Sequence, residues 1–117
     1  MGDSMTELEL ETWIVEVGGD VVEQQSVRGR EAMTPIEKLI YCVWVADYGM
    51  RNAGDLETAA DVYAPFQGEA AALAADLGLA RTRAAFELPT SDLEQQYFDL
   101  LSAVGGEISA RYDATSR

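Results

Sequence analysis

A short polar stretch, VADYGMRNAGDLE (residues 45–57), interrupts a strongly apolar part of the chain and is the first place to look for chemistry. It holds two glycines and several polar side chains, but it lacks both the P-loop lysine and the glycine spacing of a dinucleotide-binding turn. The pattern predicts a structural turn in which Gly49 ends a helix in the left-handed conformation, Asn52 bonds backbone groups, and Asp55 caps the next helix. Asp47 continues the apolar stripe of the preceding helix, and we expect its carboxylate to accept hydrogen bonds from backbone donors of the turn.

The side chains that most often carry out catalysis are scarce in this sequence. There is no histidine, which removes the commonest general base, His-based triads and most transition-metal sites. The single cysteine, Cys42, lies inside an apolar segment with no histidine to activate it, so we expect a buried structural thiol. The alternating acidic pattern of a calcium loop does not occur. We therefore predict that the chain is not an enzyme and binds no cofactor or metal, with carboxylate-based catalysis as a minor alternative.

Carboxylates are the abundant functional groups, and they are unevenly distributed. The chain has 21 acidic and 8 basic residues, a formal net charge of −13, and residues 1–25 and 55–80 contain acids but no base. The acids that we assign to a candidate partner-binding surface are Glu7, Glu9, Glu11, Glu16, Asp20, Glu23, Asp55, Glu57, Asp61, Glu69 and Asp76. This balance disfavours direct binding to nucleic acid or to an anionic membrane and favours a basic partner. The alternative is that the excess acid only keeps a small domain soluble.

The clearest predicted element is a helix over about residues 35–48, within the sequence TPIEKLIYCVWVADYG (residues 34–49). Thr34 is a good N-cap, Pro35 suits the first helical position, and Glu37 completes a capping box. Apolar side chains cover nearly the whole circumference of this segment, which is typical of a helix surrounded by others. We therefore place it at the centre of the fold.

The segments that follow also read as helices, separated by clear punctuation. Pro65 interrupts, Gly78 with Leu79 resembles a C-terminal cap, and Pro89 stops a short helix. In the last segment, Ser91 and Glu94 predict a second capping box, and the pair of glycines 105–106 predicts a kink or a close helix crossing. Residues 12–25 fit either a helix, which we favour, or a hairpin around a Gly-Gly turn.

These patterns predict one all-α domain over residues 1–117, compact and built from five to six helices around the central apolar helix. No run approaches the roughly 18 apolar residues that would span a bilayer, and no secretory signal pattern opens the chain. A single cysteine suits a reducing compartment, so we expect a cytoplasmic protein.

The span from TPIEKLIYCVWVADYGMRNAGDL through LGLARTRAAFEL to YFDLLSAVGGEISARY, roughly residues 34–113, resembles the DMP19-like family, named for a DNA-mimic protein. Pro35 and Glu37 match its opening Pro-x-Glu. In its characteristic turn Gly49 matches a glycine, and Tyr48 replaces the other. Residues that stand where the family often has Asn, Phe and Gln are Asp47, Met50 and Asn52. The resemblance implies an all-helical, non-enzymatic acidic domain that can form a homodimer and bind a DNA-binding protein.

Two functions follow as expectations. The first is non-catalytic binding of a basic, DNA-binding protein through the acidic surface, as a DNA mimic. The alternative is a structural, regulatory or immunity-like interaction protein that binds mainly through an apolar helical surface.

Overall fold

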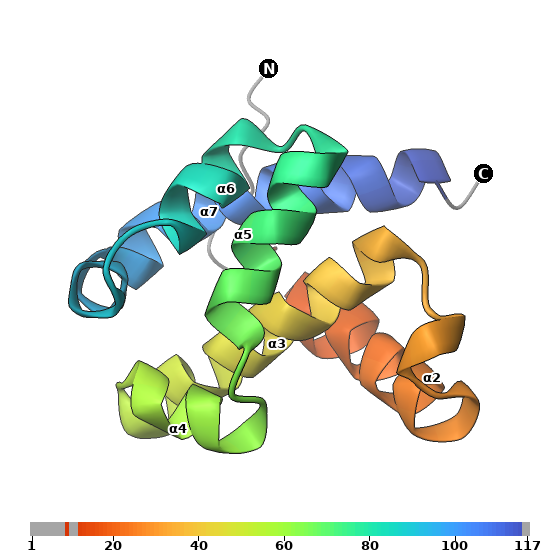
Figure 1. The fold of residues 1–117 in the computed structure, drawn as a ribbon, viewed down its shortest axis with the longest axis horizontal. Coiled ribbons are helices and arrows are strands. Elements are labelled where there is room, and N and C mark those ends of the chain that lie inside the picture. The colour runs from red at the N-terminus through yellow and green to blue at the C-terminus, as the bar shows by residue number, and fades with distance from the viewer. Residues whose placement is uncertain (1–8, 10–11, 116–117) are drawn as a thin grey trace.

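Helices make up nearly all of the structure, which is a computed structural model that describes residue 9 and residues 12–115 (Figure 1). The elements are η1 (Ile14–Gly18, a π-helix), α2 (Gly19–Arg28), η2 (Arg30–Ala32, a 3-10 turn), α3 (Pro35–Ala53), α4 (Leu56–Val62), α5 (Phe66–Leu77), α6 (Ala80–Phe86) and α7 (Thr90–Thr115). Within the described residues there are thus six α-helices and no strand. The predicted all-α class is confirmed.

The N-terminal segment is helical, so the hairpin alternative for residues 12–25 is wrong. Gly18 and Gly19, which would have formed its turn, both have right-handed helical angles at the junction of η1 and α2. A Cβ on Gly18 would lie 2.6 Å from Cδ1 of Trp44. The glycine therefore serves close packing of η1 on the indole of α3, and not a change of chain direction.

Helix α3 starts as predicted but ends later than predicted. The capping box is present: the Glu37 backbone N–H donates to Thr34 Oγ1, and the Thr34 backbone N–H donates to the Glu37 carboxylate. The prediction that Gly49 ends the helix is wrong, because α3 continues to Ala53 and the left-handed residue is Gly54, with φ of 74°. Gly49 is instead a contact point, since a Cβ there would lie 2.7 Å from the Ala59 backbone nitrogen.

Helix α3 lies at the centre of the fold and carries much of the core. Helices α2, α4, α5 and α7 all pack on it, and α6 packs on α5 and α7 (Figure 1). The core side chains that are fully enclosed include Leu39, Ile40, Cys42 and Val45 of α3. The predicted position of this helix and the predicted burial of Cys42 are confirmed. In the described part of the chain, no helix is both long and apolar enough to cross a membrane.

Helix α7 begins at Thr90, and the predicted capping box of Ser91 and Glu94 does not form. The backbone N–H groups of Asp92 and Leu93, in the first turn of α7, donate to the Pro89 carbonyl. The Glu94 carboxylate instead accepts from the Leu56 N–H at 2.9 Å, so it caps α4, which lies 38 residues away in the chain. Glycines 105 and 106 are buried within α7, which continues through them as one helix, and the predicted kink or close helix crossing at this pair stays a prediction.

Helix α7 contributes acceptors to the N-terminal ends of the two seven-residue helices, α4 and α6. Asp55 caps α4 as predicted, accepting from the Thr58 N–H at 2.8 Å, and this bond lowers the pKa of its carboxyl. Helix α6 has no side-chain cap of its own, because its N-cap residue is Leu79. Glu107 of α7 supplies the cap by accepting from the backbone N–H groups of residues 81 and 82 at 3.0 and 2.7 Å. Orphan donors at a helix start must find such acceptors when they are not solvated.

The close approach of α3 to α4 predicts opposite effects for two glycine substitutions. Gly49→Ala should lower the free energy of unfolding by about 2 kcal/mol or more, because its Cβ would press on the backbone of α4. Gly68→Ala is the matched control, since Gly68 is an exposed helical residue of α5 with nothing within 4 Å of an added Cβ. It should raise stability by about 0.5–1 kcal/mol. Urea unfolding would measure both, and equal effects would contradict the packing account.

Candidate functional site

Most described members of the predicted acidic surface are exposed, and Asp55 and Glu69 are engaged in the fold. The exposed members with described side chains are Glu9, Glu16, Asp20, Glu23, Glu57, Asp61 and Asp76. Asp55 is the cap of α4, and Glu69 accepts hydrogen bonds from two neighbouring side chains, so neither belongs to a free surface. Glu7 and Glu11 lie outside the described residues.

The exposed acids gather mainly on two helical segments. We call Glu16, Asp20 and Glu23 of η1 and α2 the α2 cluster, and Glu57 and Asp61 the α4 cluster. Figure 1 places α2 and α4 in the same half of the view, at its two corners, with α3 passing between them. Asp76 lies at the opposite end of α5 from α4. The structure therefore presents two separate acidic clusters on the flanks of α3.

Neither cluster is neutralised by the basic side chains that the structure describes. Arg51 pairs with Asp47 and Arg83 pairs with Glu87, each within a single helix at a spacing of four, and neither pair involves a member of the two clusters. Because the α2 and α4 clusters lack such partners, their negative charge is directed to solvent. At the α4 cluster an incoming cation would meet no basic side chain in the adjoining recess, whereas Arg28 lines the same recess as Asp20 and Glu23 of the α2 cluster.

Asp47 is the carboxylate whose partners differ most from the prediction. It is 6% exposed, and it accepts hydrogen bonds from side chains and not from the backbone of the turn. Arg51 Nε donates to its two oxygens at 2.8 and 3.0 Å, and the Tyr97 hydroxyl donates to Oδ1 at 2.9 Å. The Arg51 guanidinium also lies over the Phe98 ring, 5.4 Å from its centroid. Asp47 therefore joins α3 to α7 in the interior.

The other residues of the predicted turn have structural positions. Met50 is buried in the core, and Gly49 contacts α4. Asn52 donates from Nδ2 to the Tyr48 carbonyl at 2.8 Å, as the prediction of a backbone bond requires. Tyr48 itself is 43% exposed, and its ring stacks on Trp44 with centroids 5.7 Å apart. The stretch is thus the last two turns of α3, its Gly54 cap and the start of α4, with one aromatic side chain on the surface.

A second internal carboxylate, Glu69 of α5, is buried in part beside α3. It accepts from the Tyr63 hydroxyl in a short contact, and Cys42 Sγ lies 3.8 Å from its Oε2. The Tyr63 ring meets Tyr41 edge-on at 5.4 Å. The thiol is enclosed, which fits the predicted structural role. Sequence reasoning placed Glu69 on the acidic surface because nothing near it in the chain indicates these partners.

Sequence reasoning also missed the acceptors and donors that hold the short helices. Glu94 and Glu107 on α7 cap α4 and α6, and Gln67 on α5 donates to the carbonyls of residues 86 and 88 at 3.3 and 2.8 Å. One signal was present in the sequence: Leu79 precedes α6 and cannot cap it, so an acceptor had to come from elsewhere. Its identity required the tertiary structure.

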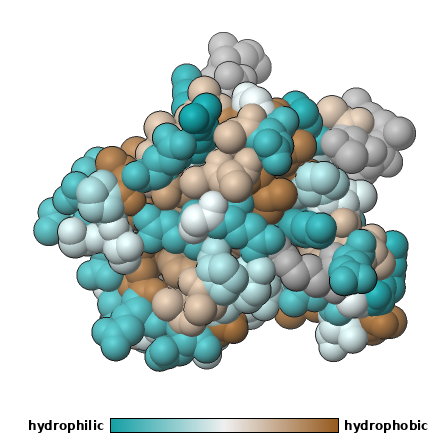
Figure 2. Space-filling model, viewed as in Figure 1, coloured by the Kyte–Doolittle hydropathy of each residue, from teal (hydrophilic) through white to brown (hydrophobic). Residues whose placement is uncertain are grey.

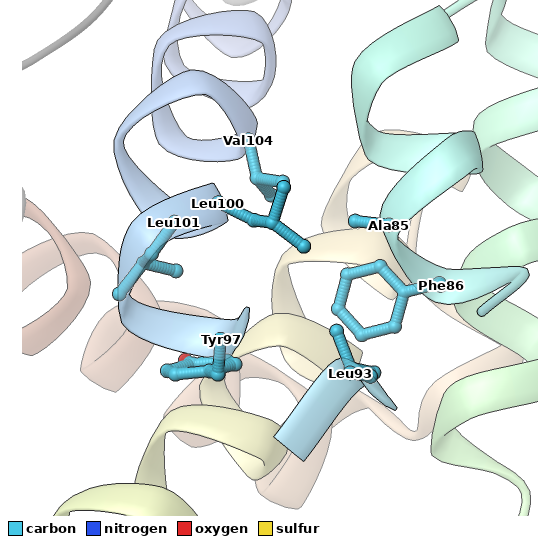
Figure 3. A pocket seen from close by; sticks show the side chains of 7 residues that line it. All are labelled: Ala85, Phe86, Leu93, Tyr97, Leu100, Leu101 and Val104. Carbon is cyan, nitrogen blue, oxygen red and sulfur yellow. The ribbon is translucent and has the colours of Figure 1, made fainter. Parts of the chain in front are cut away.

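Recesses in the surface differ in size and lining. Between α6 and α7 a cavity of about 10 Å³ is lined by apolar side chains and the Tyr97 ring, and Figure 3 shows Leu100 and Val104 facing Ala85 and Phe86 across it. That is about one water-sized probe, so it is a packing seam and not a ligand site. A groove of about 470 Å³ lies between α4, the start of α5 and the start of α7. Where side chains are described, no group of three or more His, Cys, Asp or Glu is placed to hold a metal ion.

The buried Tyr97 hydroxyl predicts loss of stability at alkaline pH. Burial, and then the negative charge of Asp47, raise the pKa of Tyr97 well above 10. The unfolded chain ionises this phenol near pH 10. Above that pH the unfolded chain therefore binds fewer protons than the native state, and the free energy of unfolding falls as pH rises. Urea unfolding between pH 7 and 11 should show this fall, and it should be shallower in Tyr97→Phe.

Tyr112→Phe is the control for that measurement, since Tyr112 is a half-buried tyrosine elsewhere on α7. At pH 7, Tyr97→Phe should cost about 1–2 kcal/mol, because Asp47 loses one hydrogen bond and keeps Arg51. Equal alkaline slopes in the two variants would show that Tyr97 is not the group responsible.

Comparison of the chain with protein-family models, with curated proteins and with solved structures finds no match. The resemblance to the DMP19-like family therefore stays a prediction, and function has to be argued from the surface itself.

Proposed function

We propose that the chain is a non-catalytic binding domain that docks on a basic protein through the α2 and α4 clusters. The observation that carries the proposal is that these five carboxylates are exposed and have no ion-pair partner among the described side chains. Interior carboxylates of the same protein, such as Asp47 and Glu107, all have donors. The contrast separates charge that holds the fold from charge available to a partner.

The leading partner class is a DNA-binding protein, which the domain would occupy as a DNA mimic. Glu16, Asp20 and Glu23 follow one another at helical spacings of four and three residues. A rise of about 1.5 Å per residue separates neighbouring members by roughly 4.5–6 Å along the axis. One DNA strand presents a charge about every 3.4 Å. The helix thus offers a sparser version of the same array, and the resemblance to the DMP19-like family supports this choice.

The proposal assigns no catalysis, cofactor, membrane or direct nucleic-acid role, and it places the protein in the cytoplasm. The reduced, enclosed thiol of Cys42 suits a reducing compartment. Homodimerisation, which the resemblance implies, would bring two charges of −13 together and would therefore have to use a surface away from the acidic clusters.

The test starts with recovery of the partner. The protein, immobilised at low salt, should capture a basic protein from a lysate of its native host, to be identified by mass spectrometry. Binding should weaken steeply between about 50 and 500 mM salt, because exposed charges are screened. Added duplex DNA should displace the domain from a DNA-binding partner. A captured protein whose dissociation constant changes neither with salt concentration nor on addition of duplex DNA would contradict the proposal.

Charge neutralisation should separate the clusters from the rest of the acidic surface. The triple variant Glu16→Gln, Glu57→Gln, Asp61→Asn should lose about tenfold or more in affinity at low salt and keep its stability within about 0.5 kcal/mol. A matched control removes three exposed acids of α7: Asp92→Asn, Asp99→Asn and Asp113→Asn. Surface plasmon resonance on both variants would measure the difference. Equal losses would mean that only total charge matters.

An interaction protein with an apolar contact is the second function that a specific observation favours. Trp44 and Tyr48 form a stacked pair on the outer face of α3, and Tyr48 is 43% exposed. Trp and Tyr are enriched among the residues that dominate protein interfaces. Under this reading Tyr48→Ser should weaken partner binding by about 2 kcal/mol with no change in its salt dependence. Unchanged binding in this variant would eliminate the aromatic pair as the contact.

A further inference from the structure

We propose that the groove between α4, α5 and the start of α7 is a socket for a lysine or arginine side chain of the basic partner. We call it the α4–α7 groove. It has a volume of about 470 Å³, and Figure 2 shows hydrophobic colour in a recess on that side of the molecule with hydrophilic residues around it. The inference rests on the proposed function and names the place where one partner side chain is recognised.

The interior of the groove suits the stem of a long cationic side chain. Leu56 and Phe66, at its base, are almost completely buried, and Ala60 adds a small apolar side chain beside them. Lys and Arg bury their methylene stems along apolar surface while the charged group stays at the polar edge. A compact anion would gain nothing from contact with this apolar floor, whereas the alkyl stem of a side chain that ends in an ammonium or guanidinium group can pack on it.

The rim of the groove supplies two carboxylates. Glu57 is exposed and belongs to the α4 cluster, and Glu94 is half-buried. One oxygen of Glu94 accepts from the Leu56 N–H at 2.9 Å, and the side chain has no other hydrogen bond to the described residues. Its other oxygen can therefore accept from a ligand. None of the described side chains that line the groove is basic, so the groove has no internal cation.

The wall of the groove is fixed before any ligand arrives. Gln67 donates to the carbonyls of Phe86 and Leu88 and accepts from the Thr90 hydroxyl at 2.8 Å. These bonds connect α5 with the end of α6 and the start of α7. A preformed wall lowers the entropic cost of binding.

A comparable recess beside α2 fits a cation less well. It has a volume of about 420 Å³ and is lined by Asp20, Glu23 and Glu37, but Arg28 lines it too. Its lining therefore already contains a positive charge. The α4–α7 groove combines a buried apolar floor with carboxylates at its rim, and no basic side chain among its lining residues neutralises them.

The test uses small probes, so it does not depend on identifying the partner. Nα-acetyl-lysine methylamide and its arginine counterpart would be titrated into the ¹⁵N-labelled protein and followed by NMR. Both should shift the backbone amides of residues 56–67 and 90–94 with dissociation constants of roughly millimolar order, as expected for one side chain. The norleucine derivative, which keeps the stem and lacks the charge, should cause at least fivefold weaker shifts at equal concentration.

Two variants with matched controls locate the binding. Glu57→Gln should weaken lysine-probe binding at least threefold, whereas Glu16→Gln, the same change in the α2 cluster, should leave it unchanged. Ala64→Trp should obstruct the groove and abolish the localised shifts, whereas Ala72→Trp, at an exposed position of α5 outside the groove, should not. If Ala64→Trp fails to fold, the Glu57 and Glu16 comparison decides.

Shifts spread evenly over all acidic helices, or equal effects of the two glutamine variants, would overturn the socket. Its failure is distinguishable from failure of the proposed function. A partner that binds in a salt-dependent way through the clusters, together with no localised probe binding, removes the groove alone. Localised probe binding with no basic partner captured removes the proposed function and keeps a cation-binding groove.

Discussion

The structure depends on one constraint, which is that α3 has too little polar surface to face water. Most of its residues between Ile36 and Met50 are buried, so other helices have to cover it on most sides. Helix α4 achieves its contact through Gly49, where the two backbones come too close for a side chain. Helix η1 packs on α3 through Gly18, whose missing side chain leaves room for the Trp44 indole. The remaining exposed strip of α3 is narrow and holds the Trp44–Tyr48 pair.

Covering α3 with short helices creates a second requirement, because each added helix start brings backbone donors that need acceptors. Helix α7, the longest in the fold, provides two of them through Glu94 and Glu107. The same helix is held to α3 by the contact of Tyr97 with Asp47. Carboxylates in this protein therefore have two separate uses. Carboxylates such as Asp47, Glu94 and Glu107 complete the hydrogen bonding of the fold, and the exposed carboxylates on α2 and α4 project a field into solvent.

Sequence reasoning succeeded where both partners of an interaction lie within a few residues. The capping box of Thr34 and Glu37, the cap at Asp55 and the glycine cap at Gly78 are all local, and all form as predicted. The Ser91–Glu94 pair looks the same in sequence, but the partner of Glu94 is at residue 56. The prediction that Gly49 is the left-handed residue failed for the same reason. Gly49 packs against α4, which is a tertiary contact, and the left-handed residue is Gly54.

The candidate site was predictable only in part, because most partners of its side chains are distant in the sequence. The sequence shows which segments lack bases, but it cannot separate Glu69, which accepts from Tyr63, from Asp61, which is exposed. It also gave no indication of the α4–α7 groove, because the groove brings together residues of α4, α5 and α7 that are distant in the chain. The tertiary structure alone distinguishes charge used internally from charge available to a partner.

The arrangement of exposed charge and recessed surface divides recognition into two physical tasks. A net charge of −13 acts over about a Debye length, so it raises the rate of encounter with any basic protein and says little about which one. Selectivity has to come from short-range contacts that fit one side chain better than another. The α4 cluster is adjacent to such a contact, because Glu57 is both part of the long-range field and part of the rim of the groove. A basic segment attracted by the α4 cluster would therefore arrive beside the apolar floor of the groove, which can hold the stem of its side chain. The α2 cluster lies across α3, so it would favour partners whose positive surface is long enough to reach both clusters.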